Sequence, residues 1–361
     1  MNLAKLTRAF ALTVGAVGVA ELLLVAVDLQ YPPQDNPLRI ELPEGRTAEG
    51  DLHERSITQL WRPKPGGLSP WSGDRMNSLG LRGAELAPQP APGVLRIAAL
   101  GDSSTFGYGL RPEEAWVVQL AATCTAAGVV AEPLNAGVVG FSARQGLERY
   151  REVVAPLEPQ LVVAAFGAIV DHVPAMGYSD ARMIEESVLA QSDYVLWARR
   201  MRSDLRVLHM AAWCVDGVRG ERTPTLDIRA RDFRASVVGS LDWPGQRRVS
   251  PAEFAQALRS LRREVEASGA RLVLLSMPRK AGVEYLTPAV TLYTQELHRL
   301  AQEEGFVLAD GRAAFGRAVA DGRTMGELFL DNFHPTALGQ GLLAQAVYAA
   351  AESSGALQVQ R

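Results

Sequence analysis

Short apolar runs of strand length alternate with amphipathic helical segments over most of this chain. Runs at 97–100, 129–134, 161–166, 271–277 and 306–309 are bounded by glycine, proline or polar turn residues. Between them, residues 113–127 carry apolar side chains at the spacing of one helical face, a helix is expected to start near Ser142, and Ser250 to Glu253 has the spacing of a capping box. The repeat of strand, loop and helix predicts a three-layer α/β/α fold with a mostly parallel central sheet.

Two segments interrupt this alternation. Residues 30–93 are rich in proline, glycine and charge, which predicts a juxtamembrane linker and edge segment. Within it, residues 77–83 are expected to form a turn with short flanking strands that takes no part in chemistry. Residues 173–249 predict an insertion that contains a helix over 183–201 and a strand over 207–213. We interpret the insertion either as a lid over the carboxyl ends of the strands or as a surface excursion. The α/β/α domain is expected to span 94–354.

The amino terminus, residues 1–29, forms a separate unit. Lys5 and Arg8 precede an apolar run at 9–27, which is nearly long enough to cross a bilayer as a helix, and Asp28 follows it. This charge order predicts an uncleaved signal anchor in the cell membrane, with a single pass and an extracytoplasmic domain. The alternatives are a cleaved signal peptide with secretion and an ordinary buried helix. Glu21 lies towards the far end of the run, where a carboxylate costs less than at mid-membrane.

Charge and cysteine content exclude several classes of protein. With 37 basic and 40 acidic residues and no dense basic run, the chain has no field that would attract nucleic acid. Cys124 and Cys214 are too few for a disulfide scaffold and are expected to be two buried thiols, with a bridge as the alternative. No group of side chains has metal-binding spacing and no phosphate-binding glycine loop is present, so no metal or organic cofactor is expected.

A serine stands where the first strand of the repeat ends. The run at 97–100 stops at Gly101-Asp102-Ser103, and helix-forming residues resume only near Glu113. Open α/β sheets bind ligands beyond the carboxyl ends of their strands, and a hydroxyl on a tight turn there can act as a nucleophile. Because Gly-Asp-Ser is also a common turn sequence, the catalytic interpretation depends on a base and an oxyanion site elsewhere.

A second chemical feature lies near the carboxyl terminus. Asp331 and His334 are three residues apart, and Pro335 is placed to start a final helix that runs to about Ala351. A carboxylate held against an imidazole fixes its tautomer and leaves the other nitrogen free to accept a proton. Alone, the pair would be an ordinary surface pair, but with Ser103 it completes a nucleophile, an orienting carboxylate and a base in the chain order Ser, Asp, His.

These blocks resemble those of the SGNH (GDSL-type) hydrolases, over roughly residues 77–351. The family's Gly-Asp-Ser block matches residues 101–103, and its Asp-x-x-His-Pro block matches residues 331–335. The glycine of the second block is best matched by Gly140, which follows the strand end at Asn135. The resemblance implies an α/β/α esterase fold. It also implies catalytic roles for the side chains of Ser103, Asp331 and His334, and an oxyanion hole that includes the backbone N–H groups of Ser103 and Gly140.

The third block departs from the family pattern. The family's Gly-x-Asn-Asp motif donates an asparagine amide to the oxyanion hole, whereas this chain has Ile169 and Val170 between Gly167-Ala168 and Asp171. Loss of one oxyanion donor typically lowers the rate about a hundredfold to a thousandfold. We expect Val170 to line the oxyanion or substrate site, with Ile169 as the alternative position. His172 is interpreted either as a substitute donor or as a solvated loop residue.

Two classes of function follow from these blocks. The first is a membrane-anchored serine esterase that acts on an O-acyl ester of a glycan, a lipid or a small molecule, or an O-acyltransferase that passes the acyl group to a sugar hydroxyl. The second is a catalytically weak or inactive domain that binds such a ligand, with its triad retained and its oxyanion site degraded. The expected partners are the acyl-ester substrate and the membrane, and the sequence does not indicate an oligomeric state.

Overall fold

The chain divides into two compact units, residues 1–40 with 185–224 and residues 41–184 with 225–361. A computed structural model describes residues 3–26, 52–173, 179–189, 246–280 and 287–358, together with a few positions between 205 and 241 and position 283.

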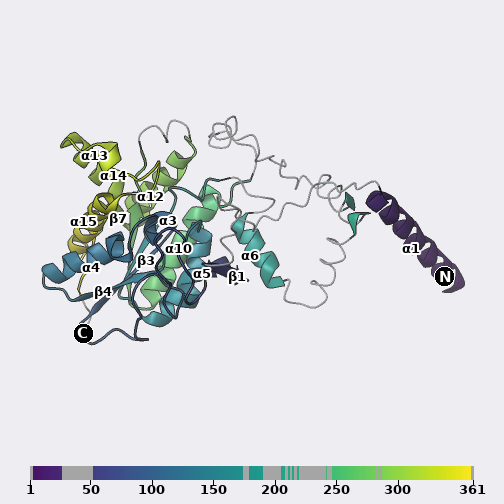
Figure 1. Cartoon of the computed structure of the whole chain (residues 1–361), viewed down its shortest axis with the longest axis horizontal. Helices are drawn as coiled ribbons and strands as arrows, with labels where there is room; N and C mark the ends of the chain where they lie inside the picture. Colours follow the sequence, from purple (N-terminus) through teal and green to yellow (C-terminus); the bar gives the residue numbers. More distant parts are fainter. Residues whose placement is uncertain are drawn as a thin grey trace. The chain divides into compact units, whose positions relative to one another are not determined.

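A five-stranded parallel sheet forms the centre of the larger unit. Its strand order is β4-β3-β5-β6-β7. Figure 1 labels β3, β4 and β7 of this sheet among the helices of the larger unit. All five strands were expected from the apolar runs, and their observed bounds are β3 (Leu95–Gly101), β4 (Ala131–Asn135), β5 (Leu161–Ala165), β6 (Arg271–Ser276) and β7 (Val307–Asp310).

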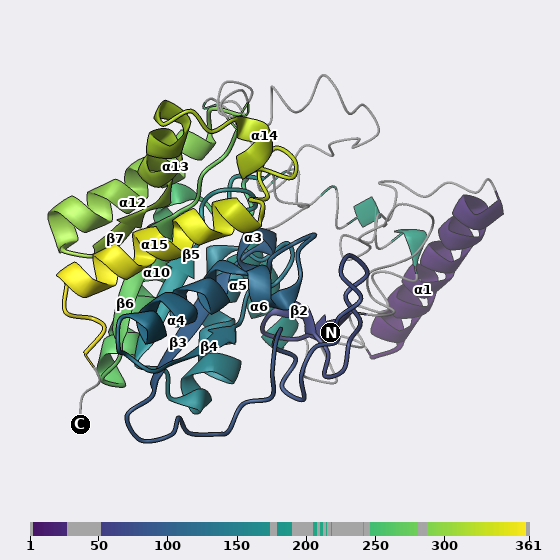
Figure 2. The same cartoon turned by 60° about the vertical axis from the view of Figure 1, so that its left-hand side comes forward.

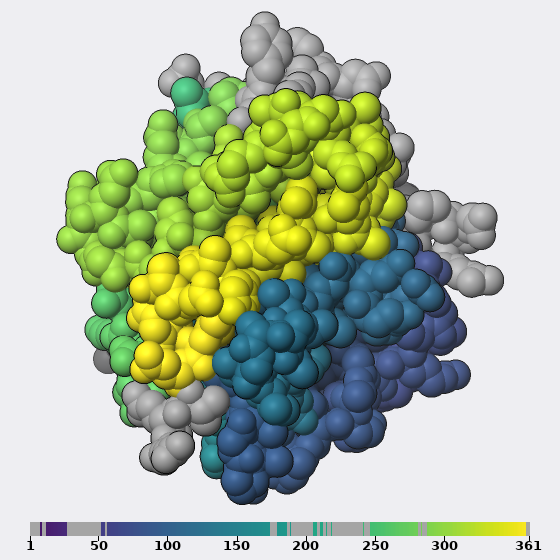
Figure 3. All heavy atoms as spheres, turned by 90° about the vertical axis from the view of Figure 1, so that its left-hand side faces the viewer, coloured from purple at the N-terminus to yellow at the C-terminus, as the bar shows by residue number. Residues whose placement is uncertain are grey.

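Helices cover both faces of this sheet, because alternate residues of a strand point to opposite sides. On one face, Ile97 and Val163 pack with α4 (Trp116–Ala126), α13 (Gly311–Ala320) and α15 (Ala337–Ser353). On the other, Leu100 and Val162 pack with α5 (Ala143–Arg149), α10 (Pro251–Ala267) and α12 (Val290–Glu304). Figure 2 shows α4 and α15 in front of the strands, and Figure 3 shows α15 running between α4 and α13 on the surface. The predicted three-layer α/β/α architecture is confirmed.

Helix starts follow the capping signals of the sequence. Ser142 caps α5 and Ser250 caps α10, each in a capping box with the residue three positions later. The last helix starts at Ala337 with Thr336 as its cap, two residues after the proline that was expected to open it. The short elements are α3 (Ser103–Phe106), α14 (Met325–Leu328), the 3-10 turns Pro112–Glu114 and Ala155–Leu157, and a π turn at Tyr150–Val154.

The strand order reverses at β3, and this reversal determines where a site can form. The chain leaves β3 for β4 on one side of it and then crosses to β5 on the other. The loops that follow β3, β4 and β5 therefore diverge from one edge of the sheet. In open α/β folds, the crevice that binds ligands lies at this point.

The segment before β3 belongs to the larger unit. It contains a hairpin of β1 (His53–Ser56) and β2 (Leu60–Pro63). The predicted turn at 77–83 is present, with Met76 bridged to Arg82. Arg82, in this turn, is buried.

The smaller unit contains α1 (Leu3–Ala26). The Glu21 carboxylate accepts hydrogen bonds from the backbone N–H groups of Arg206 (2.8 Å) and Val207 (2.9 Å). Among the described residues, no helix combines the length and the apolar character needed to cross a membrane.

Much of the insertion predicted at 173–249 lies outside the described residues. The helix α6 (Asp180–Leu189) overlaps the helix predicted at 183–201 and starts three residues before it. The remainder of the predicted helix, 190–201, lies outside the described residues. The strand predicted at 207–213 is wrong at its described positions, since 207, 210 and 211 are helical. A short apolar run does not distinguish a strand from a buried helix, which explains the error. Both cysteines are free thiols. Cys124 is buried as expected, whereas the prediction that Cys214 is buried is wrong, since this side chain is exposed.

Candidate active site

The serine at the end of β3 opens a one-turn helix. Asp102 caps this helix, α3, by accepting a hydrogen bond from the Ser104 N–H (2.9 Å), and Ser103 is its first residue. A side chain at Gly101 would come within 2.8 Å of the Ala165 carbonyl oxygen and would also collide with Thr105. Glycine is therefore required for the chain to turn so sharply between strand and helix.

Ser103, His334 and Asp331 form one continuous line of hydrogen bonds. The Ser103 Oγ lies 2.8 Å from His334 Nε2, and His334 Nδ1 lies 2.6 Å from Asp331 Oδ2. An ionised carboxylate only accepts, so Nδ1 carries the proton and Nε2 is left to accept from the serine hydroxyl. The structure brings together the three residues that the sequence singled out, and their geometry is that of a nucleophile, a base and an orienting group.

The loop that carries the base is fixed by its own backbone. Asp331 Oδ1 accepts hydrogen bonds from the N–H groups of Phe333 and His334 (both 2.8 Å), and the Leu330 N–H donates to the His334 carbonyl oxygen (2.8 Å). Partial burial opposes ionisation of Asp331, but the hydrogen bonds from His334 and Phe333 outweigh it and hold the pKa of the carboxyl below its usual value. Asp331 therefore stays ionised beside the imidazole.

The loop after β4 lies against the serine turn. The Asn135 side chain donates to the Thr105 carbonyl oxygen (3.1 Å) and the Val138 N–H donates to the Gly101 carbonyl oxygen (3.0 Å). Gly140, farther along this loop, has a φ of 80°, in the left-handed region that favours glycine. In the described part of the chain, no hydrogen bond uses the N–H group of Ser103 or of Gly140. Both remain available as donors.

The third block has no polar side chain at the position of the family's asparagine. Val170 is buried, and Ile169 is partly buried against the apolar cluster beneath β3 and β5. Asp171 instead holds the loop in place, since its carboxylate accepts from the N–H groups of Ala143 (2.8 Å) and Gly167 (2.9 Å). Burial raises the pKa of Asp171 to about 6, against these two hydrogen bonds.

His172 is buried, so its interpretation as a solvated loop residue is wrong. Burial, and then the charges of Arg279 and Arg247, lower the pKa of its imidazole to about 3. Among the described residues, its Nδ1 atom has no hydrogen-bond partner. The backbone around this residue is held by Arg247, which donates to the His172 carbonyl oxygen (2.8 Å), and by the N–H of residue 248, which donates to the Val173 carbonyl oxygen (2.7 Å).

Two residues around the triad were missed by sequence reasoning. The Tyr108 ring stacks on the His334 ring, and buried Arg82 donates hydrogen bonds to the carbonyl oxygens of the loop that carries Tyr108. The position of Tyr108 between two glycines directly after the serine helix was a signal that could have found it. For Arg82 the sequence offered none, because a single arginine in a glycine-rich turn is usually exposed.

Asp102 lies next to the nucleophile without contacting the base. It is fully buried, and burial raises the pKa of its carboxyl to about 7, against a hydrogen bond from Ser104. The nearby charges of Asp171 and Arg279 act in opposite directions on it.

Replacement of Asp102 by asparagine is expected to flatten the pH dependence of stability. In the folded chain this carboxyl keeps its proton up to about pH 7, whereas in the unfolded chain its pKa has the ordinary value of 3.8. Its contribution to stability is therefore complete below pH 3.8 and is lost as the pH rises to about 7. Asparagine caps helices as well as aspartate does. As the pH rises from 4 to 8, the free energy of unfolding of D102N should therefore increase relative to that of wild type by on the order of a few kcal/mol. Urea unfolding at both pH values measures this, and a constant difference between the two proteins would contradict it.

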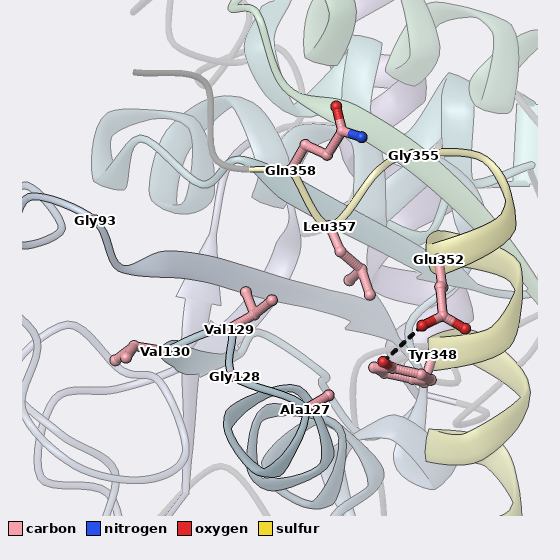
Figure 4. Close-up of a pocket in the computed structure, with 10 residues that line it drawn as sticks. All are labelled: Gly93, Ala127, Gly128, Val129, Val130, Tyr348, Glu352, Gly355, Leu357 and Gln358. Atoms are coloured by element: carbon pink, nitrogen blue, oxygen red, sulfur yellow. Dashed lines mark hydrogen bonds between the residues drawn. The ribbon is translucent and has the colours of Figure 1, made fainter.

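A separate pocket lies at the opposite edge of the sheet (Figure 4). It has a volume of about 490 Å³, and among its lining residues are Val129 and Val130 before β4 and Leu357 after α15. Tyr348 donates a hydrogen bond to Glu352 on its wall (2.9 Å). It contains none of the triad residues and borders the amino ends of the strands, which open α/β sheets do not use for ligands.

Comparisons with known proteins returned structural similarities. LAE5, an alpha/beta hydrolase enzyme from the metagenome of Lake Arreo, is 19% identical, with 73% of this chain and 97% of that chain covered and a TM-score of 0.45. A variant of Axe2, an acetyl xylan esterase from Geobacillus stearothermophilus, is 18% identical, with 74% and 97% covered and a TM-score of 0.43. A lipolytic protein of the G-D-S-L family from Desulfitobacterium hafniense is 14% identical, with 71% and 98% covered and a TM-score of 0.41.

Known families and curated proteins gave no match. No family model matches the chain. No curated protein matches it either. Structural similarities at this identity and TM-score do not assign an activity to the chain. In its α/β/α fold, and in a Gly-Asp-Ser turn that meets an Asp-x-x-His-Pro loop across the sheet edge, the chain is similar to the SGNH (GDSL-type) hydrolases.

Proposed function

We propose that this protein is a serine esterase that hydrolyses an O-acyl ester of a glycan, a lipid or a small molecule. The observation that carries the proposal is the line of hydrogen bonds from Ser103 through His334 to Asp331. Ser103 and His334 are 231 positions apart in the sequence, so their contact at 2.8 Å, with the Asp331 carboxylate behind the imidazole, is not an ordinary local pair. The arrangement provides a nucleophile whose proton has a defined acceptor.

The reaction follows from these three side chains. Ser103 Oγ attacks the acyl carbonyl carbon while its proton moves to His334 Nε2, and Asp331 stabilises the imidazolium. The tetrahedral intermediate collapses, the alkoxide of the alcohol leaves with the proton from His334, and the acyl group stays on Ser103. Water then attacks the acyl-enzyme with His334 as base and releases the acid. If a sugar hydroxyl takes the place of water, the same steps give an O-acyltransferase.

The oxyanion would be held by backbone groups. Among the described residues, the N–H groups of Ser103 and Gly140 have no hydrogen-bond partner and can act as donors, whereas the side chain of Val170 supplies no third donor. Two donors support a negative oxygen less well than three, so we expect a slow enzyme.

The absent amide also favours a second candidate, a domain that binds an acyl ester and scarcely hydrolyses it. This candidate predicts ligand binding without turnover. It retains the triad geometry and attributes the loss of activity to Ile169 and Val170.

A fluorophosphonate probe decides between the two candidates. The full-length chain would be incubated with the probe and digested, and the labelled peptide identified by mass spectrometry, alongside an assay with p-nitrophenyl acetate. The esterase predicts displacement of fluoride by Ser103 Oγ and a label on that residue alone. A correctly folded chain that takes up no label and releases no nitrophenolate would leave the binding domain as the function.

Restoring the amide should raise activity. V170N is expected to increase kcat/KM at least about tenfold, because a single oxyanion donor is worth about a hundredfold or more and the new side chain will not be ideally placed. I169N serves as the matched control and should not increase it. Steady-state kinetics of both variants measure this, with thermal unfolding to verify folding. If neither variant exceeds wild type, this loop does not limit the oxyanion site.

Membrane attachment through residues 9–27 and an extracytoplasmic location remain predictions from the charge pattern of the amino terminus.

A further inference from the structure

The base of the triad has an aromatic ring lying flat on it. The rings of Tyr108 and His334 have their centroids 4.3 Å apart and their planes 22° apart, which is a stacked arrangement. His334 is only 9% exposed. The imidazole is therefore held in its plane by Tyr108 and at its two nitrogens by Ser103 and Asp331.

Tyr108 is tied to the nucleophile through the backbone. Its N–H donates to the Ser103 carbonyl oxygen (3.0 Å), and the Gly107 N–H donates to the same oxygen (3.1 Å). Because Ser103 and Tyr108 share this anchor, the ring that stacks on the base has a fixed position relative to the attacking hydroxyl.

A buried arginine fixes the rest of this loop. Arg82 is 4% exposed and donates to the carbonyl oxygens of Phe106 (2.7 Å), Gly107 (2.8 Å) and Leu110 (2.5 Å). Its guanidinium is paired with Asp74 at 2.9 Å. Three buried carbonyl groups on both sides of Tyr108 are thus satisfied by one side chain, which leaves the loop little freedom to move.

A second aromatic ring packs against Tyr108. Trp71, from the segment before β3, lies 4.8 Å from the Tyr108 ring centroid at a tilt of 48°, and it meets Phe106 edge-on at 6.3 Å. The segment that the sequence predicted as a linker and edge segment therefore packs against the stack through Trp71. None of Trp71, Arg82 and Tyr108 belongs to the triad.

We propose that Tyr108 is a positioning residue for the catalytic base: its ring holds the His334 imidazole in the plane that points Nε2 at Ser103 and favours the imidazolium once the proton has moved. This inference rests on the proposed esterase function. A cation against an aromatic face is attracted by the negative π cloud, so the stack helps the protonated base more than the neutral one. The effect thus falls on the transition state and appears in kcat.

Other charged groups of the described residues lie near the base. Asp331 lies on its own loop, and Asp102 lies beneath Ser103 on the serine turn. After β6, Arg279 precedes Lys280, whose N–H donates to the Asn332 carbonyl oxygen (3.1 Å). All four groups are unchanged when Tyr108 is replaced, so a shift in the titration of His334 would report on the stack.

The test compares full-length variants Y108F, Y108L and, as a matched control away from the site, Y348L. Y108F keeps the ring and should stay within about twofold of wild type. Y108L should lower kcat on the order of tenfold with little change in KM, as expected for the loss of a cation–π contact. The acidic limb of its kcat/KM profile should move to lower pH by about half a unit to one unit, because the imidazolium has lost its support. Y348L should match wild type in both measurements.

Two outcomes would overturn the proposal. One is a Y108L enzyme with the kcat and pH profile of wild type, and the other is a Y108F enzyme as impaired as Y108L, which would assign the effect to the hydroxyl. If Y108L does not fold, Y108M replaces it as an unbranched side chain without a ring. NMR titration of His334 in the same proteins separates this proposal from the esterase function: in a chain without hydrolytic activity, a His334 pKa that falls in Y108L still supports the stack, and an unchanged one contradicts it.

Discussion

Replacement of Ser103 by alanine is expected to lower kcat for ester hydrolysis by about 10⁴-fold or more, because loss of any member of a catalytic triad leaves only the contribution of the oxyanion site and of binding. Alanine removes the Oγ atom that lies 2.8 Å from His334 Nε2. The first residue of α3 tolerates alanine, and Asp102 still caps the helix, so the fold should persist. Steady-state kinetics with p-nitrophenyl acetate and circular dichroism measure both effects.

The adjacent serine offers the control. Ser104 is buried on the same helix, and its Oγ lies 3.4 Å from the Phe333 carbonyl oxygen, away from the acceptor nitrogen of the base. S104A should keep its activity within about tenfold of wild type, since a long neutral hydrogen bond contributes about 1 kcal/mol. An S103A protein that retains more than a hundredth of the wild-type rate would mean that Ser103 is not the nucleophile.

Replacement of Asp331 by asparagine is expected to lower kcat on the order of 10⁴-fold, with little change in KM. Asparagine can keep its oxygen on the N–H groups of Phe333 and His334, which turns its NH₂ group toward His334 Nδ1. That nitrogen would then have to accept, so the proton would move to Nε2, which faces Ser103. A protonated Nε2 cannot take the serine proton, although every distance in the site would be nearly preserved.

Kinetics over a range of pH tests this prediction. Asp321, an exposed aspartate that precedes Asp331 in the sequence, provides the matched control. D321N should have the activity of wild type. A fall of less than tenfold in D331N would remove Asp331 from the role of orienting group. The two backbone hydrogen bonds that Asp331 accepts would then serve only to stabilise the local turn.

Local signals in the sequence were enough to predict the five strands of the central sheet and the helices α4, α5, α10 and α15, but not the hairpin β1–β2 or the helices α12 and α13. Leu161–Ala165 is apolar throughout because both of its faces are covered, and Ser250 marks a helix start by chemistry that acts within four residues. The three residues that meet at this edge of the sheet, Ser103, Asp331 and His334, could also be singled out, since they stand at strand and helix ends. Residues 207, 210 and 211 could not be assigned correctly, because a short apolar run fits a helix and a strand equally well.

The sequence by itself determined the α/β/α layering and the identity of Ser103, Asp331 and His334, because these depend on periodicity and on short motifs. Only the tertiary structure decided which other residues support them. Ser103 and His334 are 231 positions apart, and the stack of Tyr108 on His334, the burial of Arg82 and the inward turn of His172 all depend on which loops share one edge of the sheet. Burial and pairing of this kind arise from contacts between distant segments, so no local pattern records them.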